Sequence, residues 1–201
     1  MKKLLPLFIL ILGTQLNAKD IPNIVIFGDS LSAGYGIDIE QSWVSLLQTK
    51  LTNNNYNYKV INASISGETT EGGKNRIKNI LNNFQPNLII IELGGNDGLR
   101  GFPPNLIKNN LKEIIQASRL KNTSIILLGI RIPPNYGVRY TKAFENVYSD
   151  LATELDIPWV EFFMKDVALV KELMQEDQIH PNAEAQPILL ENVWPIIMKT
   201  L

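Results

Sequence analysis

The segment Asn23-Ile-Val-Ile-Phe-Gly-Asp-Ser-Leu-Ser-Ala-Gly34 joins a short apolar run to a turn of small and polar residues, and this combination indicates the class of fold. A β-branched apolar run that ends at a glycine, here Gly28, is typical of a strand buried on both faces. Strands of this kind belong to parallel sheets that helices cover on each side. Ser30 follows the strand directly, so we expect its hydroxyl at the carboxyl edge of such a sheet.

The rest of the chain alternates apolar runs with stretches of helical periodicity. Strands are expected at 58–63, 88–91, 125–128 and 157–160, and helices at 42–51, 71–84, 105–119, 140–155 and 183–198. This alternation predicts an α/β protein, a three-layer α/β/α sandwich around a flavodoxin-like, doubly wound sheet of about five parallel strands. The segment after the third strand, 93–98, is expected as a loop, and Pro187 and Pro195 should bend or shorten the last helix.

The composition of the chain narrows the classes of function. Of 201 residues, 45% are hydrophobic, which is typical of a folded globular protein. The 19 basic and 20 acidic side chains give a net charge of −1, so a role in binding nucleic acid is not expected. There is no cysteine, which excludes disulfides, zinc-thiolate sites and a cysteine nucleophile. His180 is the only histidine, so histidine-dependent chemistry must run through it.

The N-terminal segment has the layout of a secretory signal peptide. Two lysines precede an apolar run over 4–12, and small and polar residues then lead to Ala18. The run is too short to span a bilayer, which needs about 20 apolar residues. We therefore predict a signal peptide at 1–18, a single mature domain at 19–201 without a stable membrane anchor, and a periplasmic or secreted location. The alternative is that the run forms a buried first strand or helix.

An acid and a histidine near the C-terminus complement Ser30. Asp177 precedes His180 by three residues, and side chains at i and i+3 on one turn lie on the same side. Asp177 can then accept the Nδ1 proton of His180, which leaves Nε2 free to act as a base. Taken alone, Ser30 also suits a helix N-cap, and His180 also suits a structural or surface role. Together, the order serine, aspartate, histidine is a workable constellation for acyl transfer.

Two further loops offer donors for an oxyanion. Gly67 follows the second strand, and without a side chain its backbone N–H is free to face the site. Asn96 follows the third strand and carries a neutral amide that can donate. With the N–H of Ser30, these groups could form a three-donor oxyanion hole. Each residue alone also fits an ordinary turn or loop.

The segments Gly28-Asp-Ser-Leu31, Gly67, Gly94-Gly-Asn-Asp97 and Asp177-Gln-Ile-His180 resemble, in this order, the four sequence blocks of the SGNH, or GDSL, hydrolases. The resemblance covers nearly all of the expected mature domain and implies the SGNH hydrolase fold. It implies that Ser30 is the nucleophile, His180 the base and Asp177 its orienting carboxylate. It further implies Ser30, Gly67 and Asn96 as the oxyanion hole, with no metal or organic cofactor.

The resemblance is closest to one branch of the family. Segments 30–35, 62–67, 92–102 and 134–137 are similar to periplasmic enzymes with thioesterase, protease and lysophospholipase activities. The chain departs from the pattern at Gln178, where the family usually has glycine, and at Gly36, where relatives carry a larger or basic residue. The first departure bears on the flexibility of the loop before His180, and the second bears on substrate preference.

The resemblance implies a serine hydrolase that cleaves carboxylic esters and thioesters of small acyl substrates through an acyl-Ser30 intermediate. The N-terminal segment predicts that it is exported, and nothing in the sequence suggests more than a monomer. It implies an acyl-chain groove, for which the candidate substrate-binding residues are Leu99, Arg100, Phe102, Pro134 and Tyr136. The apolar candidates equally suit packing on the core, and the arginine either meets a substrate phosphate or is a solvated cation. One alternative is a carbohydrate or peptidoglycan O-acetyl esterase on the same fold. A non-catalytic flavodoxin-like domain is disfavoured, because no G-x-G-x-x-G pattern follows the first strand.

Overall fold

A single parallel sheet organises the computed structural model, which describes residues 21–201. Along the sheet the strand order is β2-β1-β3-β4-β5, so the chain winds outward in both directions from β1 and β3. This confirms the predicted doubly wound sheet. The predicted signal peptide at 1–18 lies outside the described residues. The strands are β1 (Asn23–Gly28), β2 (Lys59–Asn62), β3 (Leu88–Glu92), β4 (Ser124–Leu128) and β5 (Trp159–Val160).

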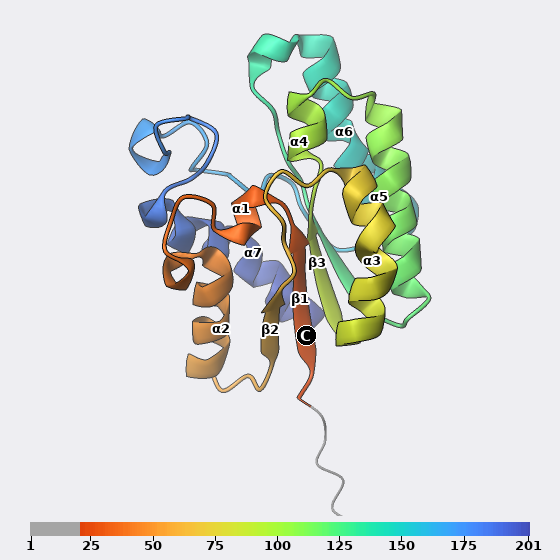
Figure 1. Ribbon diagram of the computed structural model, residues 1–201, viewed down its shortest axis with the longest axis vertical. Coiled ribbons are helices and arrows are strands. Elements are labelled where there is room, and N and C mark those ends of the chain that lie inside the picture. Colours follow the sequence, from red (N-terminus) through yellow and green to blue (C-terminus); the bar gives the residue numbers. More distant parts are fainter. Residues whose placement is uncertain (1–20) are drawn as a thin grey trace, which may run out of the picture.

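Helices cover both faces of the sheet, as predicted (Figure 1). One face carries α2 (Trp43–Asn53) and α7 (Gln186–Thr200), and the other carries α3 (Thr70–Phe84), α5 (Pro104–Arg119) and α6 (Val138–Leu155). Two short helices, α1 (Ser30–Ala33) and α4 (Gly95–Leu99), follow β1 and β3 at the carboxyl edge. Short 3₁₀ helices are Ile39–Gln41, Pro134–Tyr136, Lys171–Leu173 and Ala183–Ala185. Within residues 21–201, every helix falls short of the length and apolar character that a membrane span requires.

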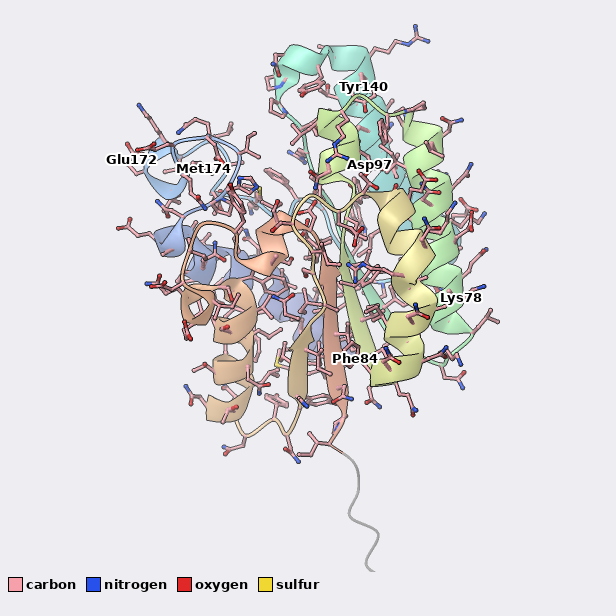
Figure 2. All side chains as sticks on the ribbon, viewed as in Figure 1. Lys78, Phe84, Asp97, Tyr140, Glu172 and Met174 are labelled. Carbon is pink, nitrogen blue, oxygen red and sulfur yellow. The ribbon has the colours of Figure 1, made fainter. Side chains whose placement is uncertain are left out.

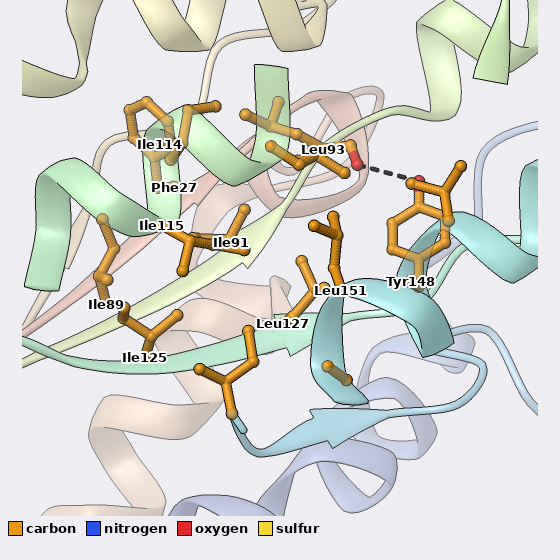
Figure 3. Packing of buried hydrophobic residues seen from close by; sticks show 14 of the residues in the cluster. Phe27, Ile89, Ile91, Leu93, Ile114, Ile115, Ile125, Leu127, Tyr148 and Leu151 are labelled. Atoms are coloured by element: carbon orange, nitrogen blue, oxygen red, sulfur yellow. Dashed lines mark hydrogen bonds between the residues drawn. The ribbon is translucent and has the colours of Figure 1, made fainter. Parts of the chain in front are cut away.

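The central strands are apolar throughout because both of their faces are buried. Along β3, Ile89 and Ile91 pack with residues of α3, α5 and α6, whereas Ile90 packs with residues of α2 and α7. Figure 3 shows the first of these clusters, where Leu93 accepts a hydrogen bond from Tyr148 Oη at 3.0 Å. Each fully buried side chain of this size contributes about 1.5–3 kcal/mol. The two clusters hold the strands rigidly and thereby set the positions of the loops beyond them.

The structure departs from the sequence predictions in a few places. The segment after β3, expected as a loop, forms α4. The fifth strand is shorter than expected and contains only Trp159 and Val160. Pro187 lies in the first turn of α7, where its missing N–H breaks no helical hydrogen bond, so the helix begins at Gln186. Pro195 lies inside α7, which nevertheless continues to Thr200, because tertiary packing of the buried face outweighs the lost hydrogen bond.

Candidate active site

The turn after β1 places Ser30 at the carboxyl edge of the sheet. Asp29 is the N-cap of α1 and accepts a hydrogen bond from Leu31 N at 3.1 Å, so Ser30 is the first helical residue and not the cap. Gly28 has to be small, since a Cβ there would lie 2.7 Å from Oε2 of Glu92. The tight turn therefore presents the Ser30 hydroxyl beyond the end of the strand.

The loop before α7 brings His180 onto Ser30. His180 Nε2 lies 2.9 Å from Ser30 Oγ, and His180 Nδ1 lies 2.6 Å from Asp177 Oδ2. The other carboxylate oxygen of Asp177 accepts the backbone N–H groups of Ile179 and His180 at 2.9 and 3.0 Å. Ser30, near the start of the domain, and Asp177 and His180, near its end, thus form one continuous chain of hydrogen bonds.

The charge on Asp177 is held by these same contacts. Desolvation alone would raise the pKa of Asp177, but hydrogen bonds from the His180 ring and from the backbone of His180 and Ile179 outweigh it and lower the pKa to about 2. The side chain of Asp177 therefore remains ionised in neutral solution. An ionised acceptor at Nδ1 favours the tautomer in which Nδ1 carries the proton, which leaves Nε2 to accept the Ser30 proton.

The two departures from the family pattern meet at Gln175. Gln178 adopts a left-handed backbone with φ of 58°, which is the conformation that favours glycine, and its N–H donates to Gln175 O at 3.0 Å. Gly36 has φ of 74°, and the Gln175 amide fills the space that a side chain there would need. That amide donates to Tyr35 O and Pro181 O at 2.8 and 3.0 Å. Gln175 thus links the histidine loop to the loop after α1.

Asn96 is oriented by the carboxylate of Asp29. Its Nδ2 donates to Asp29 Oδ2 at 3.0 Å, so the amide is held with its nitrogen toward the turn that carries Ser30. One N–H of the amide is used in this bond, and the other can donate elsewhere. Within residues 21–201, the backbone N–H groups of Ser30 and Gly67 donate to no protein acceptor. Each of the three predicted oxyanion donors therefore has an N–H without a protein acceptor in the described residues.

Several contacts tie the loop of Gly67 to its neighbours. Ile65 N donates to Gly28 O at 3.0 Å, and Gly28 N donates to Ser64 Oγ at 3.1 Å, so the loop after β2 is bonded to the end of β1. On the other side, Arg100 Nη2 reaches Gly67 O at 3.4 Å. Gly67 itself has φ of 79° and open space around the position of a Cβ. The structure thus brings Gly67 between the loops of Ser30 and Asn96.

Two buried acids beneath the site were not anticipated from the sequence. Glu92 is fully buried at the end of β3, where Oε2 accepts from Ser32 Oγ at 2.8 Å and from Asp29 N at 3.3 Å. Burial and the nearby Asp29 raise the pKa of Glu92 well above its usual value. Burial also raises the pKa of Asp29 to about 6, against the effect of its hydrogen bonds from Leu31 and Asn96. The sequence feature that could have indicated this arrangement is an acid at the end of an otherwise apolar strand.

These raised pKa values predict how stability depends on pH. Above the ordinary carboxyl pKa, Glu92 and Asp29 bind more protons in the folded state than in the unfolded state. Their contribution to the free energy of unfolding therefore falls as the pH rises through their folded pKa values. We expect Glu92→Gln to gain stability relative to the wild type as the pH rises from about 4 to about 8. Urea unfolding across this range measures the difference, and Glu113→Gln, at an exposed acid, is the control that should show no such trend. If the difference in the free energy of unfolding between Glu92→Gln and the wild type stayed constant across this pH range, the expectation would be wrong.

The candidate substrate-binding residues are divided between the surface and the core. Tyr136 is partly exposed, and its Oη donates to Leu99 O at 2.8 Å, so the 3₁₀ helix before α6 lies against the end of α4. Phe102 packs against the buried cluster around α5 and α6, and its carbonyl accepts from Tyr140 Oη at 2.7 Å. Phe102 therefore packs on the core, which was the alternative to substrate binding. Tyr136 remains a candidate for contact with substrate at the surface.

Of the remaining candidates, Leu99 is half-buried at the end of α4, and the other two lie on the outer surface. Pro134 and Arg100 are exposed, and the arginine turns back to Gly67 O instead of pointing away from the site. The structure adds Tyr35 to the residues near the site, which the sequence did not indicate. Tyr35 is 52% exposed, and its ring centroid lies 4.5 Å from that of His180. Only tertiary structure shows this proximity, because the two residues are far apart in the chain.

Other sites for ligands are few in the part of the chain that the structure describes. Residues 21–201 contain no group of three or more histidine, aspartate or glutamate side chains arranged to hold a metal ion. A cavity of about 650 Å³ lies at the amino end of the strands, lined among others by Pro86, Asn122 and Thr123. This cavity is at the opposite end of the sheet from Ser30 and His180.

The fold and the loops around Ser30 agree with a known family. The model of the GDSL-like Lipase/Acylhydrolase family matches residues 26–187, and the chain belongs to this family. It is thereby a hydrolase of the ester-cleaving type, as the four sequence blocks predicted. The match includes every predicted catalytic and oxyanion residue.

Similar proteins support this assignment over most of the chain. Esterase TesA of Pseudomonas aeruginosa is 46% identical over 192 residues, which are 96% of this chain and 94% of that protein. Thioesterase 1/protease 1/lysophospholipase L1 of Escherichia coli K12 is 43% identical over 185 residues, or 92% of this chain and 86% of that protein. The crystal structure of TesA superposes with a TM-score of 0.87 at 47% identity and covers 89% of this chain and 99% of its own. The predicted family and branch are confirmed.

Proposed function

We propose that the protein is an exported serine hydrolase that cleaves acyl esters and thioesters through an acyl-Ser30 intermediate. The observation that carries the proposal is the hydrogen-bonded chain from Ser30 Oγ to His180 Nε2 and from His180 Nδ1 to Asp177. This arrangement supplies a nucleophile, a base beside it and an anion that orients the base. A family relative of similar fold, the psychrotrophic esterase EstA from Pseudoalteromonas, has a structure inhibited by monoethylphosphonate.

Each step follows from these contacts. His180 Nε2 takes the Ser30 proton while Oγ attacks the carbonyl carbon, and the carbonyl oxygen becomes an oxyanion. The N–H groups of Ser30 and Gly67 and the Asn96 amide stabilise that charge. Protonated His180 then gives its proton to the leaving alcohol or thiol, and the acyl group remains on Ser30. Water, activated by His180, repeats the sequence and releases the acid.

The names of the relatives support ester and thioester substrates, and the loops beside Ser30 favour longer acyl groups over acetyl groups. An arylesterase of Vibrio mimicus is 43% identical over 89% of the chain, and the Escherichia coli relative is a thioesterase and lysophospholipase by name. Exposed aromatic surface at Tyr35 and Tyr136 lies near His180 and α4, where an acyl chain can lie against it. Arg100 is exposed beside Gly67, and its charge could pair with a phosphate of such substrates.

Export is supported by the sequence alone. The basic, apolar and small-residue segments at 1–18 have the layout of a signal peptide, and 19–201 form the working domain. The mass of the exported chain tests this directly, because cleavage after Ala18 leaves Lys19 as the first residue. An intact chain retained with residues 1–18 would contradict it.

A hydrolysis panel on the mature form tests the substrate class. It compares p-nitrophenyl esters of graded length, acyl-CoA and lysophosphatidylcholine at matched concentrations. We expect medium and long acyl esters to be hydrolysed at least about tenfold faster than acetate, since each buried methylene contributes about 0.8 kcal/mol. Faster turnover of acetyl esters, especially of acetylated sugars, would favour the alternative carbohydrate or peptidoglycan O-acetyl esterase.

A further inference from the structure

Asp97 is a residue of the glycine-rich stretch that the proposed reaction leaves without a role. It lies in α4, directly after Asn96, and its side chain is fully buried. Figure 2 shows Asp97 near the amino-terminal end of α3. A buried carboxylate is costly unless it is well paired, so its partners indicate what it does.

The partners of Asp97 lie at the start of α3. Its Oδ2 accepts the backbone N–H of Thr70 at 2.9 Å, and its Oδ1 accepts the Thr70 hydroxyl at 2.6 Å. Asn110 of α5 donates to the same hydroxyl oxygen at 3.1 Å. Thr70 is the first residue of α3, where backbone N–H groups lack helical partners and the helix dipole favours an anion. Both oxygens of the carboxylate therefore bind one residue of another element.

These two bonds join the loops that hold the candidate oxyanion donors. Gly67 lies three residues before Thr70, and Asn96 lies one residue before Asp97. We propose that the Asp97–Thr70 pair is a positioning clamp that sets the distance between the Gly67 N–H and the Asn96 amide. Asp29 accepts a hydrogen bond from the Asn96 amide, and the next residue, Asp97, is tied to Thr70, so the side chain and the backbone of Asn96 are each restrained through a buried carboxylate. The clamp rests on the proposed function, since it acts through the oxyanion hole.

The clamp matters for rate because the hole must fit the transition state. A misplacement of about 1 Å can cost about 10²-fold in rate without loss of substrate affinity. A merely structural pair would instead lower stability and leave turnover unchanged. The two roles are therefore separated by kcat and KM, measured on folded protein.

Thr70→Val tests the clamp while keeping the shape of the side chain. It removes the hydroxyl but keeps the backbone N–H, and we expect kcat for a p-nitrophenyl ester to fall about tenfold with KM within about twofold. Thr70→Ser restores the hydroxyl and should recover most of the lost turnover. The matched control is Thr123→Val, which removes a buried hydroxyl bonded to Pro86 O at 2.9 Å at the amino end of the sheet. This control should lower the melting temperature but leave kcat unchanged.

A second comparison asks whether the loss passes through the oxyanion hole. In an Asn96→Ala background one donor is already missing, so Thr70→Val should cost less than about threefold there. An undiminished tenfold loss in that background would overturn the proposal, as would a folded Thr70→Val with wild-type kcat. Equal losses of kcat in Thr70→Val and Thr123→Val would do the same. If Thr70→Val does not fold, Asp97→Asn is measured in its place with the same readouts.

Ser30→Ala, measured in parallel, separates this proposal from the proposed function. If Ser30→Ala hydrolyses the ester at the wild-type rate, the serine mechanism fails, and the clamp fails with it. If Ser30→Ala is inactive and Thr70→Val keeps full turnover, only the clamp fails. Loss of turnover in both Ser30→Ala and Thr70→Val, with recovery in Thr70→Ser, supports both the serine mechanism and the clamp.

Discussion

Replacing Ser30 with alanine is expected to abolish ester hydrolysis, with kcat falling by a factor on the order of 10⁴ or more. Alanine removes the oxygen that lies 2.9 Å from His180 Nε2 and leaves the base without a nucleophile to activate. The hydroxyl makes no other side-chain bond in the described part of the chain, so the fold should be unaffected. The measurement is turnover of a p-nitrophenyl ester by purified, mature protein.

The control for this variant is Ser149→Ala on α6. The Ser149 hydroxyl is exposed and donates only to Asn146 O at 3.1 Å, so its loss should leave turnover unchanged. Equal melting temperatures of the two variants would show that any difference in kcat arises at the site. Substantial turnover by folded Ser30→Ala would be incompatible with an acyl-Ser30 intermediate.

Replacing His180 with alanine is expected to be about as damaging as Ser30→Ala. His180 is the only histidine in the chain, so no second imidazole can take the Ser30 proton. The change also leaves Asp177 without its ring partner at 2.6 Å. Residues that act as a unit are not additive, so a Ser30→Ala/His180→Ala double variant should be no slower than either single variant within about threefold.

The pH dependence of the wild type gives a further readout of His180. Because a protonated imidazole cannot accept the serine proton, kcat/KM should fall on the acid side. Asp177 stays ionised there, since its pKa is lowered to about 2, so it does not account for that limb. The residual activity of His180→Ala should lack the acid limb. A profile unchanged from the wild type would contradict the assignment of His180 as base.

The sheet was predictable because burial on both faces leaves a plain mark in the sequence. The apolar runs that became β1, β3 and β4 need no tertiary information, and neither does the pairing of Asp177 with His180 at a spacing of three. The convergence of Ser30 and His180 followed from the rule that loops at one edge of a parallel sheet lie together.

The supporting contacts were not predictable, because they depend on how separate elements pack. The hydrogen bond that Thr70 donates to Asp97 joins residues 27 positions apart, and neither segment of the sequence indicates a contact with the other. The left-handed backbone at Gln178 was not expected, because residues other than glycine rarely adopt that conformation. Likewise, α4 forms in a glycine-rich stretch that suggests a loop, because the packing of Gly98 against Phe144 and Ile132 holds it in place.

The proposed mechanism depends on acylation of Ser30. Reaction of the mature protein with a fluorophosphonate probe, followed by mass analysis of its peptides, tests this directly, since the probe forms a stable adduct with an activated serine. We expect one adduct, located on Ser30, with matching loss of esterase activity and no adduct in Ser30→Ala or, at the same exposure, in His180→Ala. An adduct on another residue, or full inactivation of the enzyme with Ser30 unmodified, would contradict it.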